Sequence, residues 1–285
     1  MEVTFRPGTP QDSEVCGTVC YNAFKTIAEQ HGFPADFAAA EVTVGLMSWV
    51  LARRDVYSVV AESEGRIVGS NFLWENSVIA GVGPVSVDPA VQNAAVGRRL
   101  MELVLERARE QKFAGVRLAQ AAYHNRSLSL YTKLGFTTRE PLSCLQGPAL
   151  GVEIPGYAVR PAKEEDLEAC NRVCLAVHGH ERSPEVLEAI KQGTATVVEH
   201  DGRLTGYATV IGFAGHAVGE TNEDVKALIG AATTIAGPGM LVPTRNGELL
   251  RWCLQRGLRI TQPLNLMSLG LYNEPSGAFL PSVIY

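Results

Sequence analysis

The sequence predicts a mixed α+β fold built twice, as two tandem domains that each have a mixed, mainly antiparallel twisted sheet flanked by helices. Three observations predict this fold. The segment from Phe5 to Cys20 recurs 154 residues later as Val159 to Cys174, with an Arg-Pro pair, an aspartate and two cysteines in register. Short runs rich in β-branched residues meet at glycine-containing turns, which is typical of hairpins. Longer stretches repeat apolar residues every three or four positions, which is typical of helices that pack on a sheet.

Each element of the first copy follows from a local pattern. A short strand ends at Arg6 and Pro7, and the amphipathic helix after it has Thr9 or Ser13 as its cap. The next expected elements are strands at 56–61 and 66–74, a strand at about 78–87, a helix at about 94–111, a strand at 116–121 and a helix that ends before Gly135. Residues 146–156, rich in glycine and proline, form the expected linker. The predicted domains are therefore 1–147 and 156–285.

The second copy is shorter than the first. The hairpin glycines Gly65 and Gly69 return as Gly202 and Gly206 at an offset of 137, and Gly135 returns as Gly257 at an offset of 122. The offset falls along the chain, so the second copy has lost residues before the hairpin and again after it. Duplication followed by erosion of the second copy explains this pattern.

Length, composition and charge narrow the class of protein. The chain has 285 residues, of which 46% are hydrophobic and 19% are charged. This length is sufficient for two domains that each bury a hydrophobic core. A net charge of −5 gives no reason to expect nucleic acid or an anionic membrane as a partner. The beginning of the chain lacks the apolar core of a signal peptide, and the most apolar stretch, 37–52, is too short to span a bilayer. We therefore expect a cytoplasmic protein.

The six cysteines are expected to be buried, reduced thiols. Cys16 and Cys20, like Cys170 and Cys174, are four residues apart, which places each pair on one face of a helix. A metal site would need histidines or a Cys-x-x-Cys pair at matching spacing, and the sequence has neither. We therefore predict no metal site and no disulfide framework.

The junction at 82–100 carries the clearest functional signal. An apolar strand runs through a tight turn into the start of a helix that contains Arg98 and Arg99. A helix N-terminus leaves backbone N–H groups unpaired and carries partial positive charge, so it attracts anions. Ala94, Ala95 and Gly97 keep side-chain bulk away from these N–H groups. The turn is therefore predicted to bind phosphate groups.

The same turn resembles motif A of the GNAT acyltransferases. The family pattern Gln/Arg-x-x-Gly-x-Gly/Ala stands here as Gln92-Asn93-Ala94-Ala95-Val96-Gly97, with Ala95 in place of one family glycine. About 30 residues later, the segment from His124 to Phe136 resembles the family's motif B, an asparagine followed by a helix that ends in Tyr-x-x-x-Gly-Phe. The order and spacing of the two motifs strengthen the resemblance. Together with the repeat, they make the chain resemble a tandem two-domain form of this family with a degenerate second copy.

The resemblance implies an N-acetyltransferase. Its first domain would move an acetyl group from acetyl-CoA, its cosubstrate, to a primary amine of a small molecule or a peptide N-terminus by direct attack. Tyr131 would protonate the departing thiolate, because its ordinary pKa of about 10 leaves it protonated at neutral pH. The residues implied to contact the coenzyme are Val85, Val87, Gln92, Asn93, Ala94, Ala95, Val96, Gly97, Arg98, Arg99, His124 and Asn125.

The family also implies a splayed strand before the turn. Backbone groups near Val85 and Val87 would then pair with the pantetheine arm of the coenzyme as another strand would. The Val87 N–H would polarise the thioester carbonyl as an oxyanion donor.

The motif B contact has two candidates. The family asparagine stands seven residues before the tyrosine, which is the position of His124 in this chain, and Asn125 follows one place later. The second copy keeps Asn246 seven residues before Cys253, which favours His124 as the equivalent residue.

The general base and the acceptor site are less defined. The first candidate for the general base is Glu75, at the end of a strand. The alternatives are Glu29, His31 or a chain of water molecules. The segment 28–49 lies where the family places its acceptor-binding elements. Its apolar residues, which equally fit a core or a partly hydrophobic acceptor site, are Phe33, Phe37, Met47 and Trp49.

The second copy is predicted to bind no acyl-CoA. Glu223 and Asp224 crowd its helix start, where they would repel a pyrophosphate, and Cys253 replaces the tyrosine of the first copy. This half would instead cover the first domain's sheet or cleft, or form the interface of a homodimer. Two alternatives stand beside the N-acetyltransferase: a non-catalytic acyl-CoA-binding regulatory protein, and a tandem acyltransferase that uses another acyl group, as the mycothiol synthases do.

Overall fold

A computed structural model of the protein describes residues 2–91 and 95–284 and divides the chain into two compact units. Each unit takes a segment from the other half of the chain. The first unit consists of Met1–Thr137, Met267–Leu271 and Ile284–Tyr285, and the second of Thr138–Leu266 and Tyr272–Val283. The division into domains at 1–147 and 156–285 stays a prediction.

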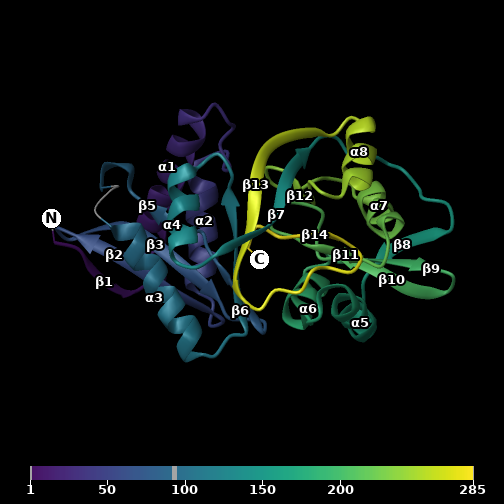
Figure 1. Ribbon diagram of the computed structural model, residues 1–285, viewed down its shortest axis with the longest axis horizontal. Coiled ribbons are helices and arrows are strands. Elements are labelled where there is room, and N and C mark those ends of the chain that lie inside the picture. Colours follow the sequence, from purple (N-terminus) through teal and green to yellow (C-terminus); the bar gives the residue numbers. More distant parts are fainter. Residues whose placement is uncertain (1, 92–94, 285) are drawn as a thin grey trace. The chain divides into compact units, whose positions relative to one another are not determined.

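The first unit has the predicted mixed α+β character (Figure 1). Its elements are β1 (Thr4–Pro7), α1 (Ser13–Gln30), α2 (Ala40–Leu51), β2 (Val56–Ser63), β3 (Arg66–Trp74), β4 (Ile79–Val82), β5 (Ser86–Val87), α3 (Val96–Glu110), β6 (Gly115–Ala121) and α4 (Asn125–Lys133). Thr9 caps a short 3-10 turn, Pro10–Asp12, and α1 begins directly after it at Ser13.

The rest of the chain repeats this order, and most of its elements are shorter. They are β7 (Thr137–Gln146), β8 (Tyr157–Pro161), α5 (Leu167–His178), α6 (Ser183–Lys191), β9 (Thr196–His200), β10 (Arg203–Ala208), β11 (Ala217–Gly219), α7 (Asn222–Ala231), β12 (Met240–Pro243), α8 (Gly247–Gln255), β13 (Arg259–Gly270) and β14 (Ala278–Leu280). The predicted linker coincides with the irregular chain between β7 and β8.

The predicted strand at 78–87 is wrong in one respect, because the structure splits it into β4 and β5. Two residues interrupt it. Gly83 has a φ of 131°, which side chains other than glycine rarely allow, and Pro84 has no N–H to offer a neighbouring strand. The indole Nε1 of Trp74 donates to the Gly83 carbonyl oxygen at 2.8 Å, which holds the interruption against β3.

The sheet of the first unit is mainly antiparallel and is covered on both faces. Its strand order is β1-β2-β3-β4-β6, and β13 follows β6 with its last residues, which belong to this unit. Only β4 and β6 pair in parallel among the strand pairs described for this unit. Successive residues of β2 point to opposite faces: Val60 packs with Cys16 and Met47 of α1 and α2, whereas Val59 packs with Leu100 of α3.

The second unit uses the same two-faced packing. Val197 of β9 lies in a cluster with Cys170 and Cys174 of α5, and the next residue, Val198, lies in a cluster with Leu228 of α7. All six cysteines of the chain are buried and free of disulfide bonds, as predicted.

An arginine-centred clamp confirms that the two units are copies of one design. In the first unit, Arg6 contacts Asp12 at 2.8 Å and Glu62 at 3.0 Å, which ties β1 to the start of α1 and to β2. The hydrogen bond from Arg6 is the main reason that the pKa of Asp12 falls to about 2. The equivalent group in the second unit is Arg160, Asp166 and Glu199.

Candidate functional site

The first unit has a gap in its sheet between β5 and β6. The parallel pairing of β4 with β6 ends at Gly81 and Arg117. Beyond that point β5 pairs with β3, through Gly69 with Val87 and Ser70 with Ser86, and no pairing of β5 with β6 exists among the described residues. The strands therefore diverge as predicted, and one edge of β5 is left open.

The register shows which backbone groups face this gap. The Asp88 N–H donates to the Val68 carbonyl oxygen at 2.8 Å, so Gly69 and Val87 form a pair that exchanges no hydrogen bonds. In such a pair the N–H and C=O groups point away from the partner strand. The backbone of Val87 therefore points away from β3. Val85 lies just before β5, outside the strand.

The described part of the turn before α3 begins at Ala95, and the predicted contacts Gln92, Asn93 and Ala94 lie outside the described residues. Ala95 is the N-cap of α3 and Val96, its first residue, is buried in the core. A Cβ on Gly97 would lie 3.6 Å from Val87 Cγ2 and 3.9 Å from Leu130 Cδ2, which are ordinary contacts. The protein itself therefore leaves room above Gly97.

Ala95 occupies a backbone conformation that suits glycine better. Its φ is 60° and its ψ is 7°, in the left-handed region. We expect Ala95→Gly to raise the free energy of unfolding by roughly 0.5 kcal/mol, because the relief of about 1 kcal/mol of backbone strain exceeds the added chain entropy of glycine. Urea denaturation measures the change. Ala90→Gly, in an exposed turn without positive φ, is the control and should give no gain; equal gains in both variants would contradict the argument.

A basic, open pocket of about 360 Å³ lies beside the start of α3. Its lining residues are Arg98, Asn125, Arg126, Ser129, Leu130 and Lys133. Arg98 and Asn125 were expected from the sequence, whereas Arg126, Ser129 and Lys133 were not. Their spacing of three to four residues along α4 is the signal that could have identified them. Arg99, in contrast, forms an ion pair with Glu106 at 2.9 Å along its own helix.

The turn between β6 and α4 is held by the buried side chain of Gln120. Its Nε2 donates to the Ala121 and His124 carbonyl oxygens and, at 2.9 Å, to Ser127 Oγ. His124 is the N-cap of α4, but its ring makes no capping hydrogen bond. Burial, aided by the nearby Arg126 and His31, lowers the pKa of His124 to about 4. The imidazole is therefore neutral at physiological pH, while Asn125 lines the pocket beside it.

Tyr131 lies on the inner side of α4, in the core that α3 and α4 form with the sheet. Its ring centroid is 6.2 Å from that of Phe136, and only 9% of the residue is exposed. Burial raises the pKa of the Tyr131 hydroxyl to about 12, so this group stays protonated across the neutral range.

The three side chains considered as the general base differ in their surroundings. Both carboxylate oxygens of Glu75 accept hydrogen bonds from Arg107, at 2.7 and 2.9 Å, which favours a structural role. Glu29 is exposed and lies 3.5 Å from Lys25. His31 Nδ1 lies 2.9 Å from the Ile27 carbonyl oxygen. A carbonyl only accepts, so Nδ1 donates in this contact, and Nε2 is the ring nitrogen left to accept a proton.

The apolar residues of the 28–49 segment divide between core and surface. Phe37 packs edge-on against Phe24, and Met47 is fully buried, so both belong to the core. Phe33, by contrast, stacks on Tyr123 with ring centroids 4.3 Å apart, and His31 lies 5.5 Å from the same ring. Aromatic rings therefore gather next to the β6–α4 turn.

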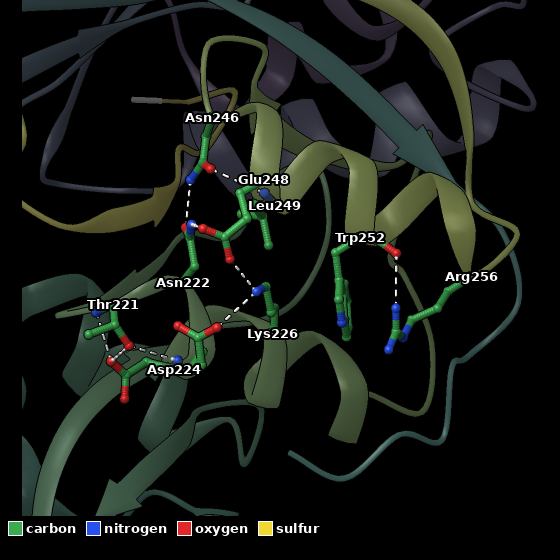
Figure 2. A network of polar contacts seen from close by, with 10 residues as sticks. Thr221, Asn222, Asp224, Lys226, Asn246, Glu248, Leu249, Trp252 and Arg256 are labelled. Atoms are coloured by element: carbon green, nitrogen blue, oxygen red, sulfur yellow. Dashed lines mark hydrogen bonds and ion pairs between the residues drawn. The ribbon is translucent and has the colours of Figure 1, made fainter. Parts of the chain in front are cut away.

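The equivalent region of the second unit is closed by its own side chains (Figure 2). Thr221 and Asp224 form a capping box that uses the backbone N–H groups at the start of α7. Lys226 Nζ lies 2.9 Å from Glu223 and also contacts Glu248, which stands where the first copy has Arg126.

The helix that follows is tied to α7 as well. Asn246 caps α8 by accepting from the Leu249 N–H, and its amide donates to Asn222 at 2.7 Å. Both Asn246 and His124 are therefore N-cap residues, which agrees with the alignment of the two copies. Cys253, in the place of Tyr131, is fully buried.

No helix among the described residues has both the length and the apolar character needed to cross a membrane.

Comparison with known proteins gives a consistent set of relatives. A model of the acetyltransferase (GNAT) family matches residues 21–136. An IAA acetyltransferase of Azospirillum brasilense is 30% identical over 118 residues, which cover 40% of this chain and 76% of that protein.

Solved structures extend the likeness to the whole chain. A candidate acetyltransferase of Pyrococcus horikoshii, 16% identical, has a TM-score of 0.74 over 99% of this chain and 92% of its own. A tandem GNAT protein from the clavulanic acid biosynthesis pathway, also 16% identical, has a TM-score of 0.57 over 94% of this chain and 98% of its own. At these identities the likeness concerns the fold.

Proposed function

This chain belongs to the GNAT acetyltransferase family, and on that premise we propose that its first unit uses an acyl-CoA cosubstrate and transfers an acetyl group from acetyl-CoA to a primary amine. The acceptor is a small molecule or a peptide N-terminus, and attack on the thioester is direct.

One observation carries the proposal: β5 is unpaired on one side among the described residues, and Gly97, which lies between Val87 of β5 and Leu130, is next to Arg98 of the basic pocket. An extended pantetheine arm can pair with the backbone groups of Val85 and Val87, as an added strand does. The phosphates would then lie at the start of α3, near Gly97 and Arg98. In the second unit, contacts of Lys226 with Glu248 and of Asn246 with Asn222 bridge α7 and α8 in the place of this pocket. We infer one coenzyme site per chain.

The proposed reaction assigns a role to each group. The amine nitrogen attacks the thioester carbonyl carbon, a C–N bond forms and the C–S bond breaks. The Val87 N–H donates to the carbonyl oxygen as negative charge develops on it. Tyr131 gives its proton to the departing thiolate, and His31 Nε2 takes the proton that the amine loses.

The same residues shape the acceptor side. The stacked rings of Phe33 and Tyr123 offer an apolar surface beside His31, which favours an amine that carries an apolar or aromatic group.

Removing the Tyr131 hydroxyl tests the proposal. We expect Tyr131→Phe to lower kcat by about 100-fold, the usual contribution of a general acid, with coenzyme A affinity unchanged. Release of free thiol from acetyl-CoA in the presence of a panel of amines measures the rate, and calorimetry measures the affinity.

Tyr157→Phe is the matched control, because this half-buried tyrosine lies in the second unit and stacks on His200. It should leave kcat unchanged. An unaltered rate in Tyr131→Phe would refute the role of Tyr131, and coenzyme binding without turnover by any amine would point to a regulatory binding protein.

A further inference from the structure

We propose that Met267 and Leu269, which come from the second copy of the repeat, are positioning residues that hold Tyr131 in the first unit. The inference rests on the proposed function, because it concerns the residue assigned there as the acid. It gives the second copy a role in the reaction although its own coenzyme region is closed.

The backbone of this segment is closely joined to the start of β6. The Leu271 N–H donates to the Ala114 carbonyl oxygen at 2.9 Å. A Cβ on Gly115 would lie 2.6 Å from the Leu271 carbonyl oxygen, and a Cβ on Gly270 would lie 2.8 Å from the Ala114 carbonyl oxygen. Such short distances leave no room for a side chain. The approach therefore requires glycine on both sides and fixes the position of the segment along β6.

The side chains of the segment reach the helix that carries Tyr131. Met267 and Leu269 are two residues apart on a strand and so face the same side of the sheet. Met267 is fully buried in the cluster that contains Tyr131 and Phe136, and Leu269 packs against that cluster. Leu269 Cδ1 lies only 3.1 Å from the position of a Cβ on Gly135, which follows α4.

These contacts restrain the C-terminal end of α4. Phe136 donates its N–H to the Tyr131 carbonyl oxygen at 3.0 Å, so a shift of Phe136 is passed directly to Tyr131. The aromatic ring of Phe136 lies against that of Tyr131. Shortening Leu269 removes packing atoms at Gly135, so α4 gains freedom and water gains access to the tyrosine. Because a general acid must meet the leaving sulfur within hydrogen-bond distance, such freedom slows the reaction.

The test compares two leucines of the same strand in the full-length protein. We expect Leu269→Ala to lower kcat about tenfold and to change the dissociation constant of coenzyme A by less than twofold. Entry of water should also move the pKa of Tyr131 from about 12 toward 10, so kcat should begin to fall at a lower pH on the alkaline side. Leu269→Met should restore most of the rate.

The control is Leu266→Ala, which truncates a buried leucine of β13 that belongs to the second unit. It should reduce stability, and it should change neither kcat nor the pH at which kcat begins to fall on the alkaline side. If Leu269→Ala does not fold, Leu269→Val serves in its place with a smaller expected loss. If Tyr131→Phe lowers kcat but Leu269→Ala leaves kcat unchanged, this inference is overturned and the role of Tyr131 stands. If Tyr131→Phe leaves kcat unchanged, the proposed role of Tyr131 itself is overturned.

Discussion

We expect Gly97→Trp to weaken the binding of coenzyme A by roughly 100-fold. The protein leaves ordinary contact distances around Gly97, but an indole would fill the space between Val87 and Leu130, which adjoins the basic pocket. Loss of two charge-assisted hydrogen bonds to phosphate, at about 1.5 kcal/mol each, corresponds to roughly 100-fold in affinity. Isothermal calorimetry with coenzyme A checks the result. Since we infer one site per chain, no second binding event should remain.

Two further variants separate steric exclusion from charge. Gly97→Ala adds a methyl group that the surroundings accept, so the fold should be unchanged and the affinity should fall only slightly. Arg98→Ala should weaken binding by about tenfold at low salt and by less at high salt, because exposed charges are screened. Normal binding by Gly97→Trp would place the coenzyme elsewhere. If Glu248→Gln abolished binding while Gly97 is unchanged, the coenzyme site would lie in the second unit.

We expect the fragment 1–147 not to fold on its own. It lacks Met267–Leu271, which the structure assigns to the first unit, and it leaves the edge of β6 unpaired. Removing a buried methionine side chain costs about 2–5 kcal/mol, and the lost strand pairing adds to that. A domain is stable by only about 5–15 kcal/mol, so these losses take most or all of its stability. An open strand edge also promotes aggregation.

Circular dichroism and size-exclusion chromatography of the fragment measure this effect. Co-expression with residues 148–285 is the control, since the second fragment returns the missing strand and should restore a soluble complex that binds coenzyme A. A monomeric, cooperatively folded fragment 1–147 with full affinity would show instead that the predicted domain boundary at 147 marks an independent unit.

The Arg6 clamp and the equivalent contacts of Arg160 show that much of the fold can be predicted from local sequence patterns. Short-range patterns, such as an Arg-Pro strand end, helix caps and hairpin glycines, recur in both halves and predict most elements to within a few residues. The strand break at Gly83 and Pro84 was missed although both residues are typical of interruptions, because the apolar run continues on either side of them.

The candidate site is only partly visible in the sequence. Motif A groups Gly97 with Arg98, and motif B groups Asn125 with Tyr131, because each motif is contiguous in the chain. Arg126 and Lys133 join Arg98 in one pocket only when α3 and α4 lie side by side. The pairing of Glu75 with Arg107 likewise joins residues from β3's end and α3, which no local pattern relates.

The amino-acid sequence by itself determined the family, the duplication and the erosion of the second copy, because each is visible in short contiguous segments and in their recurrence along the chain. Only the tertiary structure decided that Met267–Leu271 completes the first unit and that Thr138–Gln146 pairs within the second. The physical reason is that strand pairing is formed by backbone groups, which all residues share, so the choice of partner strand depends on the packing of the whole sheet.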